Sequence, residues 1–360
     1  MDTTHLILVL NPGSTSTKFA VYKNETPLFD HTVRHAAGEF DKCSGIIDQK
    51  DIRMRYILET LAAHQVRPED LSAVVGRGGL VTPLDSGTYL IDDTMVRDLA
   101  RGMAANHTSS LGGLIASEIG KKYDIPAYAV DPVVIDEMEP RARLTGIPGI
   151  ERRSVFHALN TKAIARLCAE DIGIAYEDGR FIVAHMGGGI TIGAHRYGRV
   201  IDVNDALAGE GPFTPERCGA IPVEPLVEMC FSGQYTEEEV LALCHKRGGM
   251  VAYLDTNDMR EVEKMIMQGD DHAALVMDSM AYQVAKEIGA MAAVLEGRVN
   301  AIILTGGLAH SMRFTGAIKQ MIDQIAPVKT YPGEHEMAAL VMGALRVLRG
   351  KEKAALYTQA

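Results

Sequence analysis

The sequence predicts an α/β protein built from two similar halves. Short apolar runs of strand length alternate with segments whose apolar residues follow helical spacing, a pattern typical of α/β folds. A hairpin-like stretch also occurs twice, since aligning Gly13 with Gly187 places Thr17 on Thr191 and one apolar strand on another. A repeat on this scale indicates duplication, with two halves facing across a cleft and each hairpin tip pointing inward. Chance similarity between two glycine-rich turns is the alternative.

Length and composition support two globular domains. The chain has 360 residues, too many for one small core, and its 47% hydrophobic and 23% charged residues are typical of globular proteins. The stretch 145–149 contains Gly and Pro and is the best linker candidate. We therefore expect an N-terminal domain over residues 1–147, completed by the C-terminal segment 331–360, and a nucleotide-binding domain over residues 148–330.

Charge and cysteine content exclude several classes of protein. The net charge of −11 disfavours a nucleic-acid binder, which needs a basic face. The five cysteines form no C-x-x-C pair, so neither a disulfide framework nor a zinc ribbon is indicated, and a reducing cytoplasm fits best. No apolar stretch approaches the roughly 20 residues that cross a bilayer. The first apolar run stops at Pro12, which predicts a core strand and not a signal peptide.

The first hairpin predicts a phosphate-binding tip. Residues 6–10 are an apolar run that ends at the turn signal Asn11-Pro12-Gly13, and residues 19–22 are apolar again but too few for a helix. The tip offers backbone N–H groups, hydroxyls and one ammonium group, which together suit a phosphate. These groups belong to Asn11, Gly13, Ser14, Ser16 and Lys18. An ordinary polar turn is the alternative.

Two later strands end at isolated charges. Helical spacing over 54–66 is followed by a strand at 71–75 that runs into G-R-G-G, where Arg77 is the only charge. A strand at 127–130 ends at Asp131. Ligands of α/β folds bind at such strand ends, so Arg77 and Asp131 are expected to face one crevice. A solvated loop arginine is the alternative.

The second half contains two glycine turns and a long loop. A strand at 181–184 is followed by H-M-G-G-G-I-T, and a strand at 301–304 runs into T-G-G-L, a turn that lets a flat ligand approach the backbone. Residues 202–219 are rich in loop signals and contain Arg217, and such a segment is uncommon without a binding role. The chain lacks G-x-x-x-x-G-K-[ST] and G-x-G-x-x-G, which disfavours a Walker-type NTPase and an ordinary dinucleotide domain.

Together these motifs resemble the acetate and butyrate kinase family, within the actin, sugar kinase and Hsp70 fold group. The resemblance rests on N-P-G-S-T-S-T-K, G-R-G-G, the strand end at Asp131, A-H-M-G-G-G-I-T, G-P-F-T-P-E-R-C-G, I-L-T-G-G-L and G-E-H-E-M, which follow the family order over nearly the whole chain. It implies a duplicated ribonuclease H-like fold with two similar domains around a cleft.

The family resemblance implies a reaction and its partners. That reaction is the reversible transfer of the ATP γ-phosphoryl group to a short-chain fatty acid, giving an acyl phosphate and ADP with Mg²⁺. Asn11-Pro12, the turn 187–189 and the relatively short chain look more like the family's butyrate kinases than its acetate kinases. Butyrate is therefore the expected acid, with acetate, propionate or isobutyrate as alternatives. The family also implies a homodimer or larger homo-oligomer.

The resemblance assigns catalytic roles to five residues. Arg77 would hold the acid carboxylate and the transferring phosphoryl group, and Arg217 would face it from the other domain. His185 would donate a hydrogen bond to the phosphoryl group, and His157 would support the site. Asp131 would help to orient Mg²⁺. A third family histidine is matched more loosely, by His107.

The remaining implied roles concern phosphate, nucleotide and metal. Phosphate oxygens or the Mg²⁺ shell would be contacted by Asn11, Ser14, Ser16 and Lys18. Mg²⁺ would be oriented, partly through water, by Asn11, Asp131 and Glu336, although Asn11 stands where the fold group usually has an aspartate. The α and β phosphates would lie near Gly187, Gly188 and Gly189, and the adenine against Gly306 and Gly307.

Other functions of the same fold group stay open. A sugar kinase needs an aspartate to deprotonate a neutral hydroxyl, and Asp131 is a candidate for that base. An Hsp70-like ATPase drives a partner-binding region, for which this chain shows no further domain. Any single histidine, His157 and His185 included, is alternatively a satisfied structural one.

Overall fold

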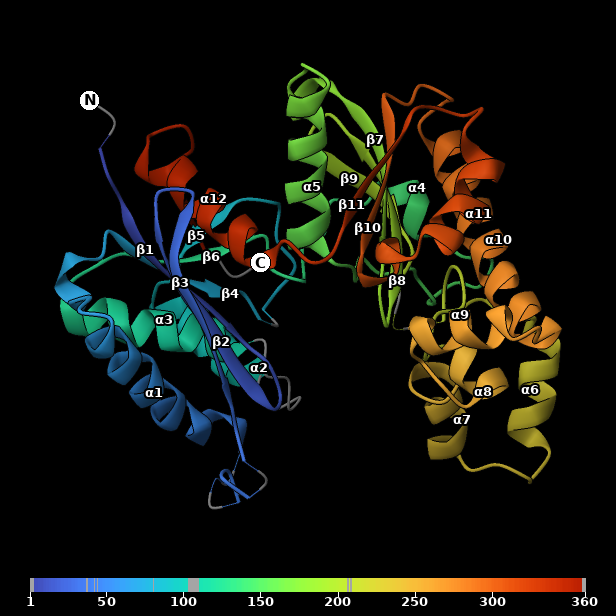
Figure 1. Cartoon of the computed structure of the whole chain (residues 1–360), viewed down its shortest axis with the longest axis horizontal. Coiled ribbons are helices and arrows are strands. Elements are labelled where there is room, and N and C mark those ends of the chain that lie inside the picture. Colours follow the sequence, from blue (N-terminus) through green and yellow to red (C-terminus); the bar gives the residue numbers. More distant parts are fainter. Residues whose placement is uncertain are drawn as a thin grey trace. The chain divides into compact units, whose positions relative to one another are not determined.

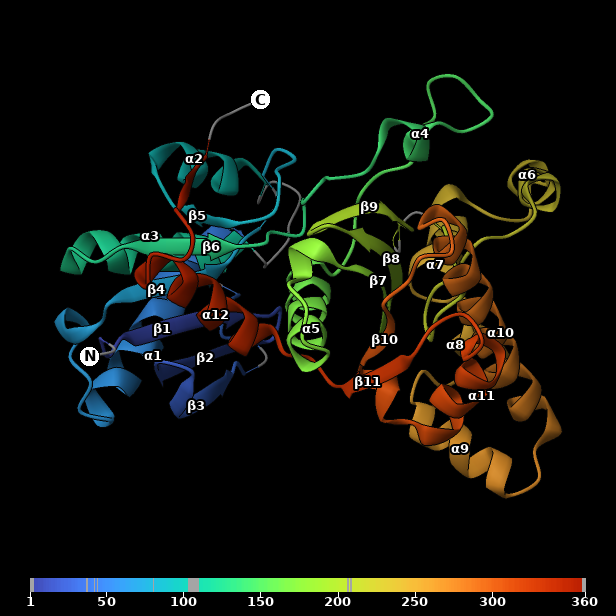
Figure 2. The same cartoon turned by 90° about the horizontal axis from the view of Figure 1, so that it is seen from above.

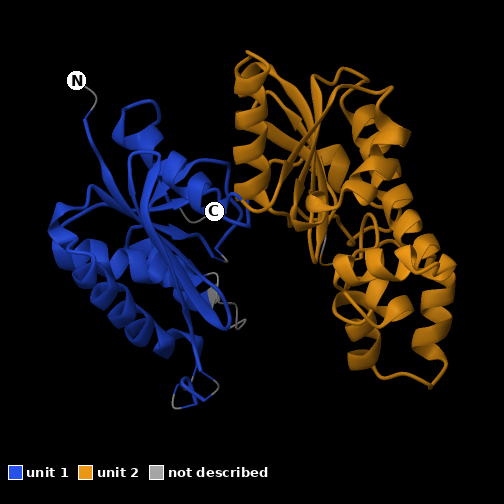
Figure 3. Cartoon of the chain, viewed as in Figure 1, with its two compact units in different colours: residues 1–135, 335–360 blue, residues 136–334 orange. Residues whose placement is uncertain are grey.

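The computed structural model describes residues 3–36, 38–41, 43, 45–79, 81–102, 110–205, 207 and 209–357 (Figure 1). The chain divides into two compact units (Figure 3). Unit 1 comprises Met1–Ile135 and His335–Ala360, and unit 2 comprises Asp136–Glu334. Each unit is a sheet with helices on both faces.

Unit 1 is built on a seven-stranded sheet in the order β12-β5-β6-β4-β1-β2-β3. Its strands are β1 (Leu6–Pro12), β2 (Ser16–Lys23), β3 (Thr26–Arg34), β4 (Ala73–Arg77), β5 (Thr88–Leu90), β6 (Ala127–Val130) and β12 (Ala355–Leu356). Its helices are α1 (Gln49–Ala63), α2 (Asp93–Gly102), α3 (Ser110–Tyr123) and α12 (Glu336–Leu348). Figure 1 shows α1 and α3 on one face of the sheet and α12 on the other.

Unit 2 is built on a five-stranded sheet in the order β11-β10-β7-β8-β9. Its strands are β7 (Arg180–Met186), β8 (Ile190–Arg196), β9 (Arg199–Val203), β10 (Ala301–Gly306) and β11 (Val328–Pro332). Its helices are α4 (Pro140–Arg143), α5 (Ala158–Asp171), α6 (Val223–Phe231), α7 (Glu237–His245), α8 (Met250–Leu254), α9 (Met259–Met267), α10 (Asp271–Val294) and α11 (Met312–Ile322). Seen from above, α5 lies on one side of the sheet and α10 on the other (Figure 2).

Sheet pairing confirms the predicted repeat. In unit 1, β1 and β2 form an antiparallel hairpin, β3 continues it, and β4 pairs with β1 in parallel. In unit 2, β7, β8 and β9 form the same meander, and β10 pairs with β7 in parallel. Both hairpins expected from the apolar runs are therefore present, at corresponding places in the two sheets.

One predicted helix begins earlier than its apolar spacing indicated. The periodic pattern predicts a helix from residue 54, but α1 begins at Gln49. The side chains of α1 that are buried are Arg53, Ile57 and Leu61, which lie one turn apart on one face. Because an arginine occupies the first buried position, the apolar period of the sequence starts one turn late.

Candidate active site

The β1–β2 hairpin tip is shaped by a buried arginine from α1. The turn closes with a hydrogen bond from Gly13 N to Ser16 O at 2.8 Å. Arg53 is fully buried and donates from Nη1 to Ser16 O and Thr17 Oγ1, each at 2.8 Å, and from Nη2 to Ser14 O at 3.2 Å. Its burial lowers the pKa of Arg53 to about 10. Since this cation holds the carbonyl groups from behind, they cannot face an anion on the outer side of the tip.

The side chains predicted to contact phosphate line the same hairpin. Ser14 and Lys18 are exposed and Ser16 is half-buried. Lys18 pairs directly with Asn11 across the two strands, so the two side chains lie on one face of the sheet. These positions agree with a tip whose hydroxyl and ammonium groups are open to solvent.

Three of the predicted residues meet at the end of β1. Asn11 Nδ2 donates to Glu336 Oε2 at 2.7 Å, and Arg77 Nη1 lies 3.2 Å from the same oxygen and 3.4 Å from Asn11 Oδ1. Glu336 is the first residue of α12, where a carboxylate also interacts favourably with the helix dipole. Arg77 Nε is buried and has no hydrogen-bond partner among the described residues. The guanidinium group therefore keeps a donor for an anionic ligand.

Glycines explain why Arg77 reaches this position. A Cβ atom on Gly76 would lie 2.2 Å from Gly112 O, and one on Gly79 would lie 2.0 Å from Ser110 Oγ. The G-R-G-G segment therefore packs backbone to backbone against the first turn of α3. A larger residue at Gly76 or Gly79 would push β4 away from this helix.

Asp131 follows β6, the neighbour of β4, as the sequence predicts. β1, β4 and β6 are adjacent and parallel, so Asn11, Arg77 and Asp131 all lie at the carboxyl-terminal edge of the sheet. Asp131 is buried, with a φ of 38°, and its Oδ1 accepts from Ser86 Oγ at 2.6 Å and from Gly87 N at 2.9 Å. A left-handed backbone at a non-glycine residue is uncommon and turns this carboxylate away from the strand direction.

His185 of the β7–β8 hairpin stacks on His157, the residue that precedes α5. The rings of His157 and His185 lie 3.9 Å apart with an interplanar angle of 16°. His185 Nδ1 donates to Asn160 Oδ1 at 3.0 Å, and His157 Nδ1 lies 3.0 Å from Thr191 Oγ1. A Cβ atom on Gly187 would lie 3.7 Å from His185 Nε2, so this ring nitrogen lies beside the hairpin tip.

Arg217 lies against the tip of this second hairpin. A Cβ atom on Gly189 would be 2.3 Å from Arg217 Nη1, so the guanidinium group occupies the space that a side chain would fill. Thr214 Oγ1 donates to Gly188 O at 2.7 Å and accepts from Arg217 N at 3.1 Å. Burial lowers the pKa of Arg217, while the charges of Glu216 and Asp205 oppose that shift. Direct contacts thus connect the hairpin tip with Thr214 and Arg217.

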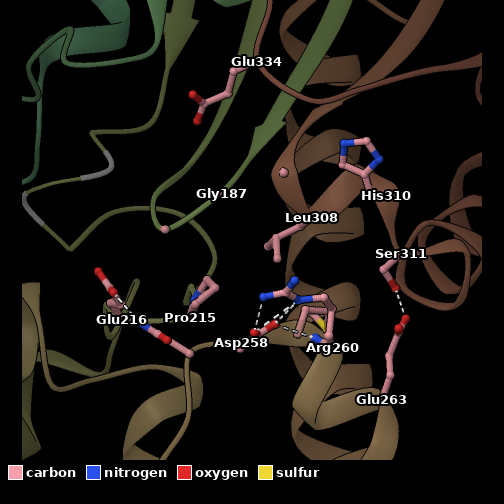
Figure 4. Close-up of a pocket in the computed structure, with 14 residues that line it drawn as sticks. Gly187, Pro215, Glu216, Asp258, Arg260, Glu263, Leu308, His310, Ser311 and Glu334 are labelled. Atoms are coloured by element: carbon pink, nitrogen blue, oxygen red, sulfur yellow. Dashed lines mark hydrogen bonds and ion pairs between the residues drawn. The ribbon is translucent and has the colours of Figure 1, made fainter. Parts of the chain in front are cut away.

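A cavity of about 740 Å³ opens beside the same tip. It is lined by Gly187, Gly188, Pro215, Glu216, Asn257, Asp258, Met259, Arg260, Glu263, Gly307, Leu308, His310, Ser311 and Glu334 (Figure 4). On its wall Arg260 Nη2 lies 2.6 Å from Asp258 Oδ2, and this hydrogen bond, with that from the Arg260 backbone, lowers the pKa of Asp258 to about 2. The volume is within the usual range for small-molecule sites.

The turn after β10 forms another part of this wall. Gly306 has a φ of 89°, and a Cβ atom there would lie 2.4 Å from Met186 O, so only glycine allows β10 to end this close to β7. A Cβ atom on Gly307, by contrast, would meet no atom within 4 Å. Gly307 therefore presents an open backbone surface to the cavity, as predicted for a flat ligand.

Sequence reasoning missed several residues of these sites. Arg53 and Thr214 hold the two hairpin tips, and Asp258 and Arg260 line the cavity. The only sequence signal for the last two is a helix start, since Asp258 caps α9. His107 lies outside the described residues.

The oxygen donors at the end of β1 fit a Mg²⁺ ion whose other ligands come from water and substrate. Mg²⁺ prefers oxygen and usually takes one or two carboxylates, with water and phosphates completing its shell. Asn11, Asp131 and Glu336 supply such oxygens at one sheet edge. Among the described residues, no group of three or more His, Cys, Asp or Glu side chains is arranged to hold a metal alone. Substrate phosphates would therefore have to complete the coordination.

Comparison with known proteins identifies the fold. Residues 145–323, just under half of the chain, match the model of the Acetokinase family. The Porphyromonas gingivalis acetate kinase is 19% identical with a TM-score of 0.79, over 96% of this chain and 100% of that one. The Francisella tularensis subsp. tularensis SCHU S4 propionate kinase is 18% identical with a TM-score of 0.75, over 94% and 98%.

A more distant likeness extends to a sugar kinase. The ROK hexokinase from Thermus thermophilus is 16% identical with a TM-score of 0.51, over 96% of this chain and 100% of that one. At these identities the likenesses establish the fold, and they confirm the predicted α/β class and the actin, sugar kinase and Hsp70 fold group. In the described part of the chain, no helix is long and apolar enough to span a membrane.

Proposed function

We propose that this chain, whose residues 145–323 match the model of the Acetokinase family, is a short-chain fatty acid kinase that prefers butyrate. It would transfer the γ-phosphoryl group of ATP reversibly to the acid, giving an acyl phosphate and ADP. The family match supports a kinase that phosphorylates a carboxyl group. The choice of butyrate rests on the likeness of Asn11-Pro12 and the three-glycine turn to butyrate kinases.

One observation carries the proposal: a single hairpin tip joins the cavity of unit 2 to Arg217. Gly187 and Gly188 line the cavity, and Gly189 touches the guanidinium group of Arg217. A nucleotide whose base occupies the cavity near Gly307 would place its phosphates along a tip that has no side chains. Its terminal phosphate would then reach the arginine.

The chemistry needs charge stabilisation more than a base. A carboxylic acid is already ionised at pH 7, because carboxyl pKa values lie near 4. The obstacle is repulsion between the carboxylate and the phosphates, so catalysis depends on positioning and on stabilising the charge of the transferring phosphoryl group. In this mechanism Arg217 and His185 bind the phosphoryl oxygens, and His157 holds the ring of His185 by stacking.

Unit 1 itself carries groups that suit a carboxylate and a phosphate. The unpartnered Nε of Arg77 and its exposed guanidinium edge suit a carboxylate, and the hairpin tip with Ser14, Ser16 and Lys18 suits phosphate oxygens. Asn11, Asp131 and Glu336 would hold Mg²⁺ directly or through water. The metal, when bound, neutralises phosphate charge.

A sugar kinase is the second candidate, favoured by the buried position of Asp131 at a strand end and by the fold shared with a hexokinase. A kinase for a neutral hydroxyl needs a free carboxylate oxygen as base. Asp131 Oδ1 already accepts two hydrogen bonds, from Ser86 and Gly87, which orient the carboxylate within the protein.

The test is a series of kcat/KM values for straight and branched acids of two to five carbons, with the acyl phosphate trapped by hydroxylamine. We expect butyrate to give the highest value, and neighbouring acids to fall by about tenfold per methylene, since one methylene is worth about 1–3 kcal/mol. Glucose and glycerol serve as controls in an ADP-release assay. Phosphorylation of a sugar alone would overturn the carboxylate kinase, whereas a preference for acetate would overturn only the choice of butyrate.

A further inference from the structure

Two cysteines far apart in the sequence lie together beside Arg217. Cys218 N donates to Cys244 O at 3.4 Å, so the two residues are in direct backbone contact. A direct backbone hydrogen bond brings the Cα atoms of its two residues close together. A disulfide spans Cα separations of about 4.4–6.8 Å. The backbone contact therefore brings Cys218 and Cys244 near the separation that a disulfide needs.

The backbone around this pair makes close contacts. A Cβ atom on Gly248 would be 2.8 Å from Cys218 N, and one on Gly249 would be 1.9 Å from Thr214 O. Met250 N also donates to Thr214 O at 3.0 Å. The residues between α7 and α8 thus pack against the turn that carries Arg217. A displacement of Cys218 would therefore move this turn as well.

We propose that Cys218 and Cys244 are an oxidation site, at which a hydroperoxide forms a disulfide that displaces Arg217 from the Gly189 tip and inactivates the enzyme. The loss of activity rests on the proposed function, whereas formation of the disulfide does not. Cys244 is half-buried near the end of α7, and its neighbour Cys218 borders a second cavity of about 620 Å³.

The reaction proceeds in two balanced steps. The Cys244 thiolate attacks one peroxide oxygen, the O–O bond breaks, and the leaving hydroxide takes up the thiol proton as water. The Cys218 sulfur then attacks the resulting sulfenic acid, the S–O bond breaks, and a second water leaves with the Cys218 proton. Two thiols are oxidised to one disulfide, and one hydroperoxide is reduced.

The environment of each thiol fixes this order. Burial, together with the charge of Cys244 and a hydrogen bond to it, raises the pKa of Cys218 to about 11. Cys218 Sγ also donates to Gly219 O at 3.2 Å, as a neutral thiol does. Cys244 is therefore the attacking group. Once Cys244 is a sulfenic acid, Cys218 is the neighbouring sulfur that can react with it.

The experiment treats the whole protein with hydrogen peroxide and follows two independent signals. Peptide mass spectrometry measures a cross-link between Cys218 and Cys244, and a kinase assay measures kcat before and after reduction with dithiothreitol. We expect the cross-link to form and kcat to fall by at least about tenfold, since small displacements of a catalytic group have effects of this size. Reduction should restore both signals.

Two serine variants control the test. Cys244→Ser removes the attacking thiol and should keep its kcat in peroxide, whereas Cys230→Ser, at an exposed cysteine of α6, should be inactivated like the parent chain. Absence of the cross-link in the parent chain would overturn the oxidation site, and a cross-link without loss of kcat would overturn its effect on Arg217. A chain with no carboxylate kinase activity would still give the cross-link, so failure of the proposed function is seen separately.

Discussion

The two hairpins have the same topology, but different groups hold their tips. In unit 1 the tip carries hydroxyl and ammonium side chains, and Arg53 binds its carbonyls from within the core. In unit 2 the tip is three glycines, Thr214 binds Gly188 O, and Arg217 lies against Gly189 from a loop. A cation thus accompanies each hairpin, but one is fully buried and the other reaches the surface of the site.

This difference distinguishes Arg53, which binds only groups of the protein, from Arg217, for which we propose a catalytic role. Arg53 donates hydrogen bonds to backbone oxygens and to Gln49 Oε1, so it stabilises the shape of the tip. Arg217 instead occupies the space left by a missing side chain, where it can meet a ligand on the glycine tip. Substitution of Arg53 should therefore lower the stability of the fold, whereas substitution of Arg217 should lower turnover.

The largest effect is expected for Arg217→Ala. If Arg217 stabilises the transferring phosphoryl group, its loss should lower kcat by about 10²-fold to 10³-fold, with a much smaller change in KM for ATP. Arg217→Lys should recover only part of this, because a point charge does not reproduce the planar fork of donors. Steady-state kinetics with butyrate and ATP measure both constants.

Free guanidine is a control for this variant, since it should restore some activity to Arg217→Ala by filling the vacated space. A thermal melt verifies folding. A folded Arg217→Ala enzyme whose kcat changes by less than about threefold would remove Arg217 from the mechanism, because surface substitutions usually stay within about 0.5 kcal/mol.

An intermediate effect, on stability, is expected for Arg53→Met. Methionine fills part of the volume but removes the hydrogen bonds that Arg53 donates to Ser14 O, Ser16 O and Thr17 Oγ1, which should destabilise the hairpin by about 2–3 kcal/mol. Amide hydrogen exchange of β1 and β2 measures this change. Arg55→Met is the matched control on the exposed face of the same helix and should leave the exchange rates unaltered. Equal protection in both variants would show that Arg53 does not hold the tip.

The comparison also explains what the sequence could and could not predict. The hairpins, their repeat and the strand ends at Arg77 and Asp131 follow from local apolar runs and turn signals, and the sheet pairing confirms these elements. Strand β3 was not expected, since its side chains are mostly exposed and give no alternating pattern. Local patterns predict elements well when one face of the element is apolar.

Functional contacts were harder to predict because they join distant residues. The contact between Asn11 and Glu336 depends on the docking of α12 onto the sheet, which no local pattern encodes. Arg53 and Arg55 look alike in the sequence, yet one is fully buried and the other exposed. The roles assigned by family resemblance to Arg77, Arg217 and the histidines stay predictions until the variants are measured.

The smallest effect is expected for Gly189→Ala, which sharpens the comparison without removing any polar group. The new methyl group would lie 2.3 Å from Arg217 Nη1, so the guanidinium group must move. That atom is the far end of a flexible side chain, and Gly189 lacks a left-handed backbone, so the fold should tolerate the change. We expect kcat to fall by about tenfold while the melting temperature stays nearly constant.

Gly188→Ala is the matched control for this last variant, one residue away on the same tip. Its methyl group would lie 3.7 Å from Glu216 Oε2, an ordinary contact that leaves Arg217 in place. Gly188 also lines the cavity, so a change in KM for ATP in this variant is consistent with the proposal. Its kcat should stay within about threefold of the parent value. Equal losses of kcat in the two variants would mean that the tip needs open glycine backbone throughout. A loss confined to Gly189→Ala would show that turnover depends on where the Arg217 guanidinium group lies.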